Sequence, residues 1–257
     1  MNLIEIAEKL KEAENSKRPC APIREHLTEK DLDSAYKIQQ LNIEKEVKNG
    51  KKIVGKKIGL TSLKVQEQLG VNQPDFGILL DSMEIPANEE VDFSKFMQPK
   101  VEAEIAFILK NDLIGTNNTI ADIEKAIDYA VMAIEVVGSR IENWNIKITD
   151  TIADNASSSH FLLGTQRVAL DQLDLINNKM ELYINEEKVS EGDGTSCLGN
   201  PLKAVVWLAN KMASINNPLR KGEIILSGAL GPMAEFKKGD VISASIEGLG
   251  DLQFSTK

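Results

Sequence analysis

The segment from Pro99 to Lys110 constrains the fold most strongly, because apolar residues occupy every second position along it. Alternation with a period of two is typical of a β-strand. Glu102 and Glu104 fall on one face of this strand, about 7 Å apart, because side chains two positions apart point the same way. The apolar Ala106 and Ile108 follow them on that face.

Two carboxylates on an otherwise apolar face repel each other and resist desolvation. A divalent cation between them would remove both penalties, because hard cations take carboxylate oxygens as ligands. The alternative is a solvent-facing strand edge that carries two ordinary surface glutamates. Glu135 favours the cation, because it is the lone charge in the apolar run from Ala130 to Val137. Such a carboxylate must be paired, neutralised or bound to a cation.

The composition argues against nucleic acid as the main partner. The chain has 257 residues, of which 42% are hydrophobic and 27% charged, which is ordinary for a globular protein. Its net charge is −9, from 30 basic and 39 acidic residues. The chain has no dense cluster of lysine and arginine, as a nucleic-acid surface would need. An anionic small molecule remains compatible, because a lysine or a metal ion can reverse the charge inside a pocket.

Cysteine and histidine usage argues against two further classes of protein. Cys20 and Cys197 have no Cys-x-x-Cys partner, and the histidines are His26 and His160. A Cys/His zinc site and a disulfide scaffold are therefore poorly supported. The first residues carry charges unlike those of a signal peptide, and no uncharged apolar run approaches the length of a membrane span. We expect a cytoplasmic protein that does not enter a membrane.

The periodicity predicts an α+β fold with a mixed, mainly β core, an N-terminal helical segment and peripheral helices. We expect residues 1–50 to form the helical segment and residues 51–257 a mixed β domain, together one continuous domain. Thr28 and Asp31 resemble a capping box, and Gly70 is expected to close a short helix. The main predicted elements are helices over 3–13, 31–48, 63–69, 120–132 and 201–212, and strands over 52–60, 133–137, 161–164, 180–184 and 223–226.

Several segments together resemble one family, although none of them would be specific alone. They are Gly55–Thr61, Gln66–Gly77, Pro99–Ala106, Glu135–Arg140, Ala153–Ser157 and Leu226–Pro232. The family that they resemble is the 2-keto-4-pentenoate hydratases, within the fumarylacetoacetate hydrolase superfamily. The resemblance covers nearly the whole chain.

The resemblance implies a hydro-lyase of aromatic meta-cleavage catabolism. Such an enzyme adds water to 2-hydroxypenta-2,4-dienoate (2-oxopent-4-enoate) and gives 4-hydroxy-2-oxopentanoate. It implies a divalent metal, Mg²⁺ or Mn²⁺, held by a Glu-x-Glu pair and a third carboxylate. These ligands carry over to Glu102, Glu104 and Glu135. It further implies a mixed β roll or sandwich of the fumarylacetoacetate hydrolase type, with residues 51–257 as the catalytic domain. It also implies a homo-oligomer, and a pathway decarboxylase or aldolase as a protein partner.

The mechanism implied by the resemblance needs a proton donor, a base for water and groups that hold the substrate. Lys57 is the candidate for an electrostatic or acid role, and Asp75 for the base. Asn155 and Ser159 are candidates for hydrogen bonds to the substrate. Each also has a plain structural interpretation: a solvated strand lysine, a turn aspartate, or loop side chains that satisfy backbone groups.

Three functions remain open from the sequence. The first is the hydratase. The second is another enzyme on the same scaffold, either a 4-oxalocrotonate-type decarboxylase or an acylpyruvate C–C hydrolase; the serine-rich run before His160 keeps the decarboxylase open. The third is a non-catalytic subunit that binds a pathway partner. The presence of Lys57, Asp75 and the carboxylate candidates argues against this third function.

Overall fold

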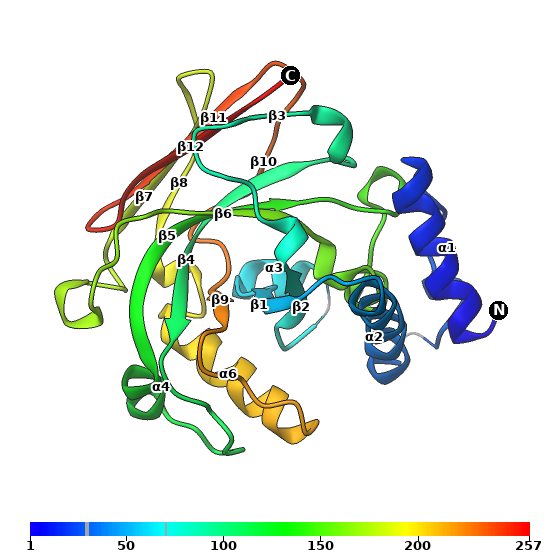
Figure 1. Ribbon diagram of the computed structural model, residues 1–257, viewed down its shortest axis with the longest axis horizontal. Coiled ribbons are helices and arrows are strands. Elements are labelled where there is room, and N and C mark those ends of the chain that lie inside the picture. Colours follow the sequence, from blue (N-terminus) through cyan, green and yellow to red (C-terminus); the bar gives the residue numbers. More distant parts are fainter. Residues whose placement is uncertain (29–30, 70) are drawn as a thin grey trace.

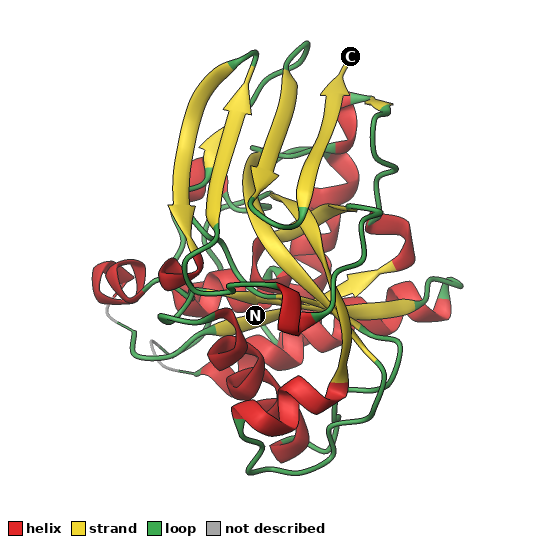
Figure 2. Cartoon of the chain, turned by 90° about the vertical axis from the view of Figure 1, so that its left-hand side faces the viewer, coloured by secondary structure: helices red, strands yellow, loops and turns green. Residues whose placement is uncertain are grey.

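The computed structural model describes residues 1–28, 31–69 and 71–257, which form two β-sheets with helices packed outside them (Figure 1). Figure 2 shows the smaller sheet at one end of the molecule and most of the helices at the other. The larger sheet has the spatial order β2 (Asp75–Leu80), β1 (Ile53–Gly59), β9 (Ile224–Leu226), β4 (Lys100–Leu109), β5 (Ile127–Val137) and β6 (Ser158–Leu163), with β10 (Ala234–Glu235) paired to β4. The smaller sheet has the order β3 (Glu90–Val91), β12 (Gly250–Thr256), β11 (Val241–Ile246), β7 (Lys179–Ile184) and β8 (Glu187–Asp193). The expected α+β architecture is confirmed.

Strands β4 and β5 form the long antiparallel pair at the centre of the larger sheet (Figure 1). Their register sets Glu102 opposite Glu135 and Ala106 opposite Val131. The other face of β4 carries Ile105 and Phe107, which are fully buried in the main hydrophobic core. Helix α6 (Pro201–Ser214) contributes to the same core, and it begins with Asn200 capping the backbone N–H of Leu202. One face of β4 therefore packs in the main core, and the other face carries the carboxylates.

The N-terminal helices α1 (Leu3–Ser16) and α2 (Leu32–Lys48) form a second hydrophobic cluster with α5 (Ile148–Ala153). Ile6, Leu10, Ile38 and Ile152 lie at its centre and are almost fully buried. The buried side chain of Gln39 ties this cluster to the larger sheet, because its Nε2 donates to the carbonyl oxygens of Phe76 and Ile152, each at 3.0 Å. The helices are therefore attached to the sheet by the hydrogen bonds of Gln39 as well as by apolar packing.

The predicted helix over residues 120–132 is wrong beyond its first two turns. Helix α4 ends at Ala126, and β5 begins at Ile127, well before the predicted strand start at residue 133. The intervening residues pair with the far half of β4, where Tyr129 lies opposite Ile108. A strand buried on both faces gives a continuous apolar run, which period alone cannot distinguish from a helix. Pairing with β4 therefore decided the conformation.

Of the two expected helix ends, one is corrected by the structure and the other lies outside the described residues. Asp31 itself caps α2, since its carboxylate accepts the backbone N–H of Ser34; residues 29–30 of the expected capping box lie outside the described residues. Gly70, expected to close helix α3 (Leu63–Leu69), also lies outside them. The residues from Asp150 to His160 are mostly small and polar, which is typical of a turn-rich segment, but the first of them belong to helix α5. None of the helices in the described ranges combines the length and apolar character that a bilayer span requires.

Candidate active site and metal centre

The register of the larger sheet gathers charged side chains on one face. Leu226 of β9 lies opposite both Lys57 of β1 and Ala106 of β4, so Lys57 shares a face with Glu102 and Glu104. Glu135 joins them because it lies opposite Glu102. Four strands thus bring into one cluster residues that are far apart in the sequence.

The carboxylates of Glu102, Glu104 and Glu135 can each place one oxygen within 4.8 Å of the others. Glu104 and Glu135 are fully buried, whereas Glu102 is partly exposed toward a cavity. Burial raises the pKa of Glu102 to about 7, with Lys57 opposing the shift and Glu135 adding to it. Burial, followed by repulsion from Glu135 and Glu102, also holds the pKa of Glu104 well above its usual range. The cluster is short of positive charge.

Hydrogen-bond donors among the described residues do not compensate for the negative charge of the cluster. Glu104 accepts one bond, from the backbone N–H of Gly228 at 2.8 Å, and its other oxygen has no partner in the described residues. Glu135 lies 3.2 Å from the Lys57 ammonium as an ion pair, but neither of its oxygens accepts a hydrogen bond there. Buried carboxylate oxygens without donors are costly. A donor set made only of hard oxygens fits a divalent cation such as Mg²⁺ or Mn²⁺.

Lys57 and Asp75 flank the carboxylates. Lys57 is almost fully buried, and its ammonium donates to the carbonyl oxygen of Ala156 at 3.1 Å. Burial alone would lower the pKa of Lys57, but Glu135, Glu102 and Asp75 raise it above its usual range. Lys57 therefore stays charged.

Asp75 is equally buried, and neither of its carboxylate oxygens has a partner in the described parts of the chain. Burial raises the pKa of Asp75 to about 6, with Lys57 opposing the shift. A Cβ atom on Gly59 would lie 2.2 Å from Asp75 Oδ1, so only glycine leaves room for the carboxylate. This close approach explains one of the two glycines in β1.

The cluster opens into a cavity of about 690 Å³. Lys57, Asp75 and Glu102 lie in its wall. The remaining wall is mainly apolar and includes Leu60, Val65, Val137, Ile146, Trp144, Pro232 and Met233. A charged end and an apolar wall suit a small acid with an unsaturated hydrocarbon part.

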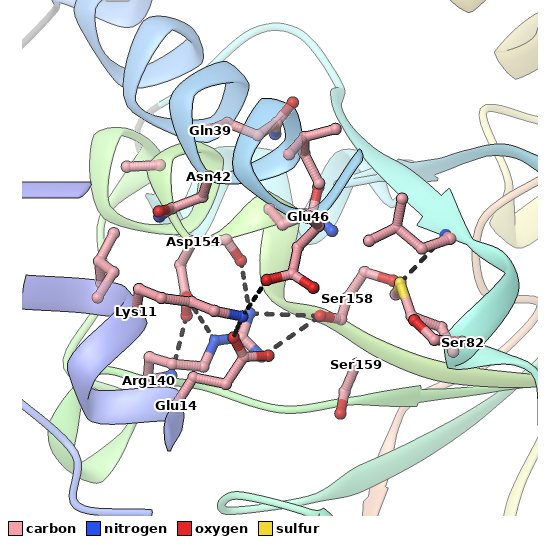
Figure 3. Close-up of a pocket in the computed structure, with 16 residues that line it drawn as sticks. Lys11, Glu14, Gln39, Asn42, Glu46, Ser82, Arg140, Asp154, Ser158 and Ser159 are labelled. Atoms are coloured by element: carbon pink, nitrogen blue, oxygen red, sulfur yellow. Dashed lines mark hydrogen bonds and ion pairs between the residues drawn. The ribbon is translucent and has the colours of Figure 1, made fainter. Parts of the chain in front are cut away.

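Asn155 and Ser159 do not line this cavity. Both residues line instead a second, smaller cavity of about 120 Å³, where Figure 3 shows Ser159. The Asn155 amide bonds to the backbone of Ile78, and Ser159 Oγ lies 2.8 Å from Nδ1 of His160. The two residues predicted to bind substrate are therefore separated from the two predicted to perform catalysis.

The smaller cavity is bordered by paired charges. Lys11 Nζ lies 2.6 Å from Glu14 and 2.7 Å from Glu46 (Figure 3). Arg140 is ion-paired with Asp154, and its Nη2 donates to the Asp154 carbonyl oxygen at 2.6 Å. The Lys11 pairs join α1 to α2, and the Arg140 pair joins the segment after β5 to the turn that precedes β6.

Two groups that contact the cluster could not be predicted from the sequence, because they belong to the backbone. They are the N–H of Gly228, which binds Glu104, and the carbonyl of Ala156, which binds Lys57. The one available signal was the glycine itself. Gly228 has φ +102°, and a Cβ there would lie 2.4 Å from Thr61 Oγ1.

The fold and the carboxylate cluster place the chain in a known class of enzymes. Residues 41–256 match the family model described as fumarylacetoacetate (FAA) hydrolase C-terminal. The chain is 50% identical over 243 residues to 2-keto-4-pentenoate hydratase 2 of Dechloromonas aromatica, covering 95% of this chain and 93% of that protein. It is 49% identical over 250 residues to the 2-keto-4-pentenoate hydratase of Paraburkholderia phymatum, covering 97% and 95%. The chain belongs to the 2-keto-4-pentenoate hydratase family and is a hydro-lyase.

Solved structures agree with this fold. The 4-oxalocrotonate decarboxylase of Pseudomonas putida G7, complexed with magnesium and adipate, superposes with a TM-score of 0.95 at 33% identity, covering 99% of this chain and 97% of that one. The fumarylpyruvate hydrolase of Pseudomonas aeruginosa, complexed with Mn²⁺ and pyruvate, superposes with a TM-score of 0.63 at 13% identity, covering 78% and 88%. The second likeness concerns the fold alone.

Proposed function

We propose that this hydro-lyase is metal-dependent and adds water to 2-hydroxypenta-2,4-dienoate, giving 4-hydroxy-2-oxopentanoate in aromatic meta-cleavage catabolism. The observation that carries the proposal is the buried cluster of carboxylates with unpartnered oxygens, next to Lys57 and Asp75 at the charged end of an apolar cavity. The hydratase relatives supply the reaction class.

Glu102, Glu104 and Glu135 would hold a divalent cation, Mg²⁺ or Mn²⁺. The magnesium and Mn²⁺ complexes of the solved relatives support this choice of metal class. When bound, the cation supplies positive charge that stabilises negative charge developing on the substrate oxygens. The carboxylate cluster itself supplies the buried anionic end of the cavity that selects such a cation.

Asp75 is the proposed base. Its raised pKa, about 6, leaves it ionised at neutral pH yet basic enough to accept a proton from water. Lys57 carries a permanent positive charge at the same end of the cavity, where it stabilises the negative charge that develops on the substrate oxygens in the transition state. In the overall change, C5 gains a proton, C4 gains hydroxide, and the proton of the 2-hydroxyl is replaced by one gained at C3 as the 2-hydroxydiene becomes a 2-oxo acid. Atoms balance with one water.

A decarboxylase of the 4-oxalocrotonate type is the second candidate, because the whole chain superposes on such an enzyme with a TM-score of 0.95. Its substrate class differs by a second carboxylate at the far end of the molecule. Lys100 and Lys64 line the larger cavity and offer positive charge for such a group. The higher identity to hydratases, 50% against 33%, favours the hydratase.

A direct comparison of two substrates tests the proposal. Purified protein with Mg²⁺ would be given freshly generated 2-hydroxypenta-2,4-dienoate, with loss of the diene absorbance followed, and 2-oxohex-3-enedioate in parallel, with CO₂ followed. Loss of the dienoate without CO₂ is the expected result. Release of CO₂ from the diacid, with the dienoate untouched, would overturn the hydratase in favour of the decarboxylase.

We also propose that the protein is a homo-oligomer and that a pathway decarboxylase or aldolase can bind it. Both statements rest on the family resemblance. Analytical ultracentrifugation at micromolar concentration tests the first, and a sedimentation coefficient of a 28.3 kDa monomer would contradict it.

A further inference from the structure

The turn between the two cavities has an unusual backbone. Asn155, Ala156 and Ser157 are three consecutive residues with positive φ, at 55°, 50° and 56°. Residues other than glycine rarely adopt this left-handed backbone conformation. A run of three such residues persists only where the surrounding structure enforces it. Strain of this kind concentrates at functional sites.

The Asn155 side chain holds the turn against the sheet through two hydrogen bonds. Its Oδ1 accepts the backbone N–H of Ile78 at 2.8 Å, and its Nδ2 donates to the carbonyl oxygen of Ile78 at 2.9 Å. The amide thus reproduces both bonds that a paired strand would make with β2. Gly77 allows the approach, because a Cβ there would lie 2.4 Å from the Asn155 carbonyl oxygen.

The same turn also holds Lys57. The Ala156 carbonyl oxygen accepts from Lys57 Nζ at 3.1 Å, and Glu135 provides the other close contact of that ammonium, at 3.2 Å. Without the carbonyl, Lys57 would be directed by the carboxylates alone. The far ends of the turn are fixed separately, by the Arg140–Asp154 pair and by the Ser157 carbonyl, which accepts the Gly138 N–H at 2.8 Å.

We propose that Asn155 is a positioning residue, whose amide pins the left-handed turn to β2 so that the Ala156 carbonyl holds the Lys57 ammonium beside the carboxylate cluster. This inference rests on the proposed function for its effect on catalysis. It assigns Asn155 no contact with substrate. A misplacement of the ammonium by about 1 Å can cost about a hundredfold in rate.

Asn155→Gly is the sharpest variant, because glycine tolerates positive φ and only the amide is lost. Asn155→Asp is the second variant: its carboxylate can still accept from Ile78 but cannot donate to the Ile78 carbonyl. Asn42→Ala is the matched control, because the Asn42 amide donates to the Ala7 carbonyl at 3.1 Å on the helical side of the smaller cavity. That bond has no link to Lys57.

The first measurement is steady-state kinetics on the dienoate with Mg²⁺. We expect kcat to fall about tenfold to a hundredfold in both Asn155 variants, with KM within about twofold, and both constants to be unchanged in Asn42→Ala. A rise in KM with unchanged kcat would make Asn155 a substrate ligand and overturn the proposal. Unchanged constants in Asn155→Gly would overturn it too.

The second measurement needs no activity. In protein labelled with ¹⁵N-lysine, the buried Lys57 ammonium should give a slowly exchanging NMR signal, assigned by its absence in Lys57→Met. We expect that signal to shift or broaden away in Asn155→Gly and to persist in Asn42→Ala; its persistence in Asn155→Gly would refute the positioning role. If the signal behaves as expected but wild-type protein hydrates no dienoate, the proposed function fails and the positioning role stands.

Discussion

At the scale of single residues, Glu104 is the carboxylate most dependent on a cation, because it is fully buried and, unlike Glu135, has no ion pair with a described residue. Glu104→Gln keeps the shape but removes the charge. We expect the Kd for Mn²⁺, measured by calorimetry, to rise at least about a hundredfold, since loss of an outer hydrogen-bond partner alone costs about 10–100-fold. The melting temperature of the metal-free protein should not fall, because the substitution removes a buried charge.

Glu181→Gln is the control for this substitution. Glu181 lies on β7 and pairs with Lys188 at 3.2 Å, where its side chain is 42% exposed. Its loss should leave Mn²⁺ binding unchanged. Wild-type Mn²⁺ affinity in Glu104→Gln would exclude Glu104 as a ligand.

Gly228 gives a second prediction for a single residue. Gly228→Ala would place a methyl group 2.4 Å from Thr61 Oγ1 at a φ of +102°, which disturbs the N–H that binds Glu104. We expect a loss of about 1–3 kcal/mol in the free energy of unfolding and about tenfold weaker Mn²⁺ binding.

Gly222→Ala separates backbone strain from the close approach. Gly222 has φ +87°, and a Cβ atom there would meet no atom of the described residues within 4 Å. Its substitution should cost about 1–2 kcal/mol in stability and leave Mn²⁺ binding unchanged. Equal Mn²⁺ affinities in the two alanine variants would contradict the role of the Gly228 N–H.

At the scale of single elements, β6 carries a pH-sensitive side chain. Burial, with Lys17 and Lys95 adding to it, lowers the pKa of His160 from 6.5 to about 4. Between pH 6.5 and about pH 4, His160 binds a proton in the unfolded chain but not in the folded protein. The free energy of unfolding should therefore fall by up to about 3 kcal/mol as the pH falls from 7 to 4.

Chemical denaturation of wild type and His160→Gln across this pH range isolates the effect. Buried acids such as Asp154, whose pKa burial raises to about 6, act in the opposite direction and contribute equally to both proteins. The free energy of unfolding of wild type should therefore fall relative to that of His160→Gln as the pH falls. A constant difference would mean that His160 titrates normally in the fold.

The sequence predicted the elements whose pattern is local. The alternation in β4 and the apolar stripes of α1, α2 and α6 led to nearly correct bounds. The boundary between α4 and β5 was wrong because the apolar residues from Ala130 to Met132 fit either a helix or a strand, and pairing with β4 decides the conformation. Helix α5 was missed because each of its six residues is buried by contacts from elsewhere in the chain.

At the scale of the whole molecule, the N-terminal helices are part of the enzyme's stability. Ile6, Leu10, Ile23 and Ile38 are almost fully buried against α5 and its neighbours. Their burial is worth about 6–12 kcal/mol, as much as the whole stability of a typical domain, about 5–15 kcal/mol. A chain that begins at Lys51 should therefore lack a cooperative thermal transition by circular dichroism. A sharp transition from that chain would show that residues 51–257 fold alone.

The candidate site was only partly predictable at this scale. The carboxylates were found because each is a charge in an apolar pattern. Lys57 and Asp75 were found through the family resemblance, and the sheet register brings them to the same face. The bonds of Asn155 to Ile78 depend on a turn between two cavities, which no local pattern encodes.

Metal dependence of the hydration is the central claim, and a stripped-enzyme assay tests it most directly. Protein freed of metal with a chelator would be mixed with 2-hydroxypenta-2,4-dienoate, and the diene absorbance followed before and after addition of Mg²⁺ or Mn²⁺. We predict no reaction until the cation is added, then formation of 4-hydroxy-2-oxopentanoate by wild type and none by Glu104→Gln. Full activity of the stripped protein, unchanged by added cation, would contradict the account.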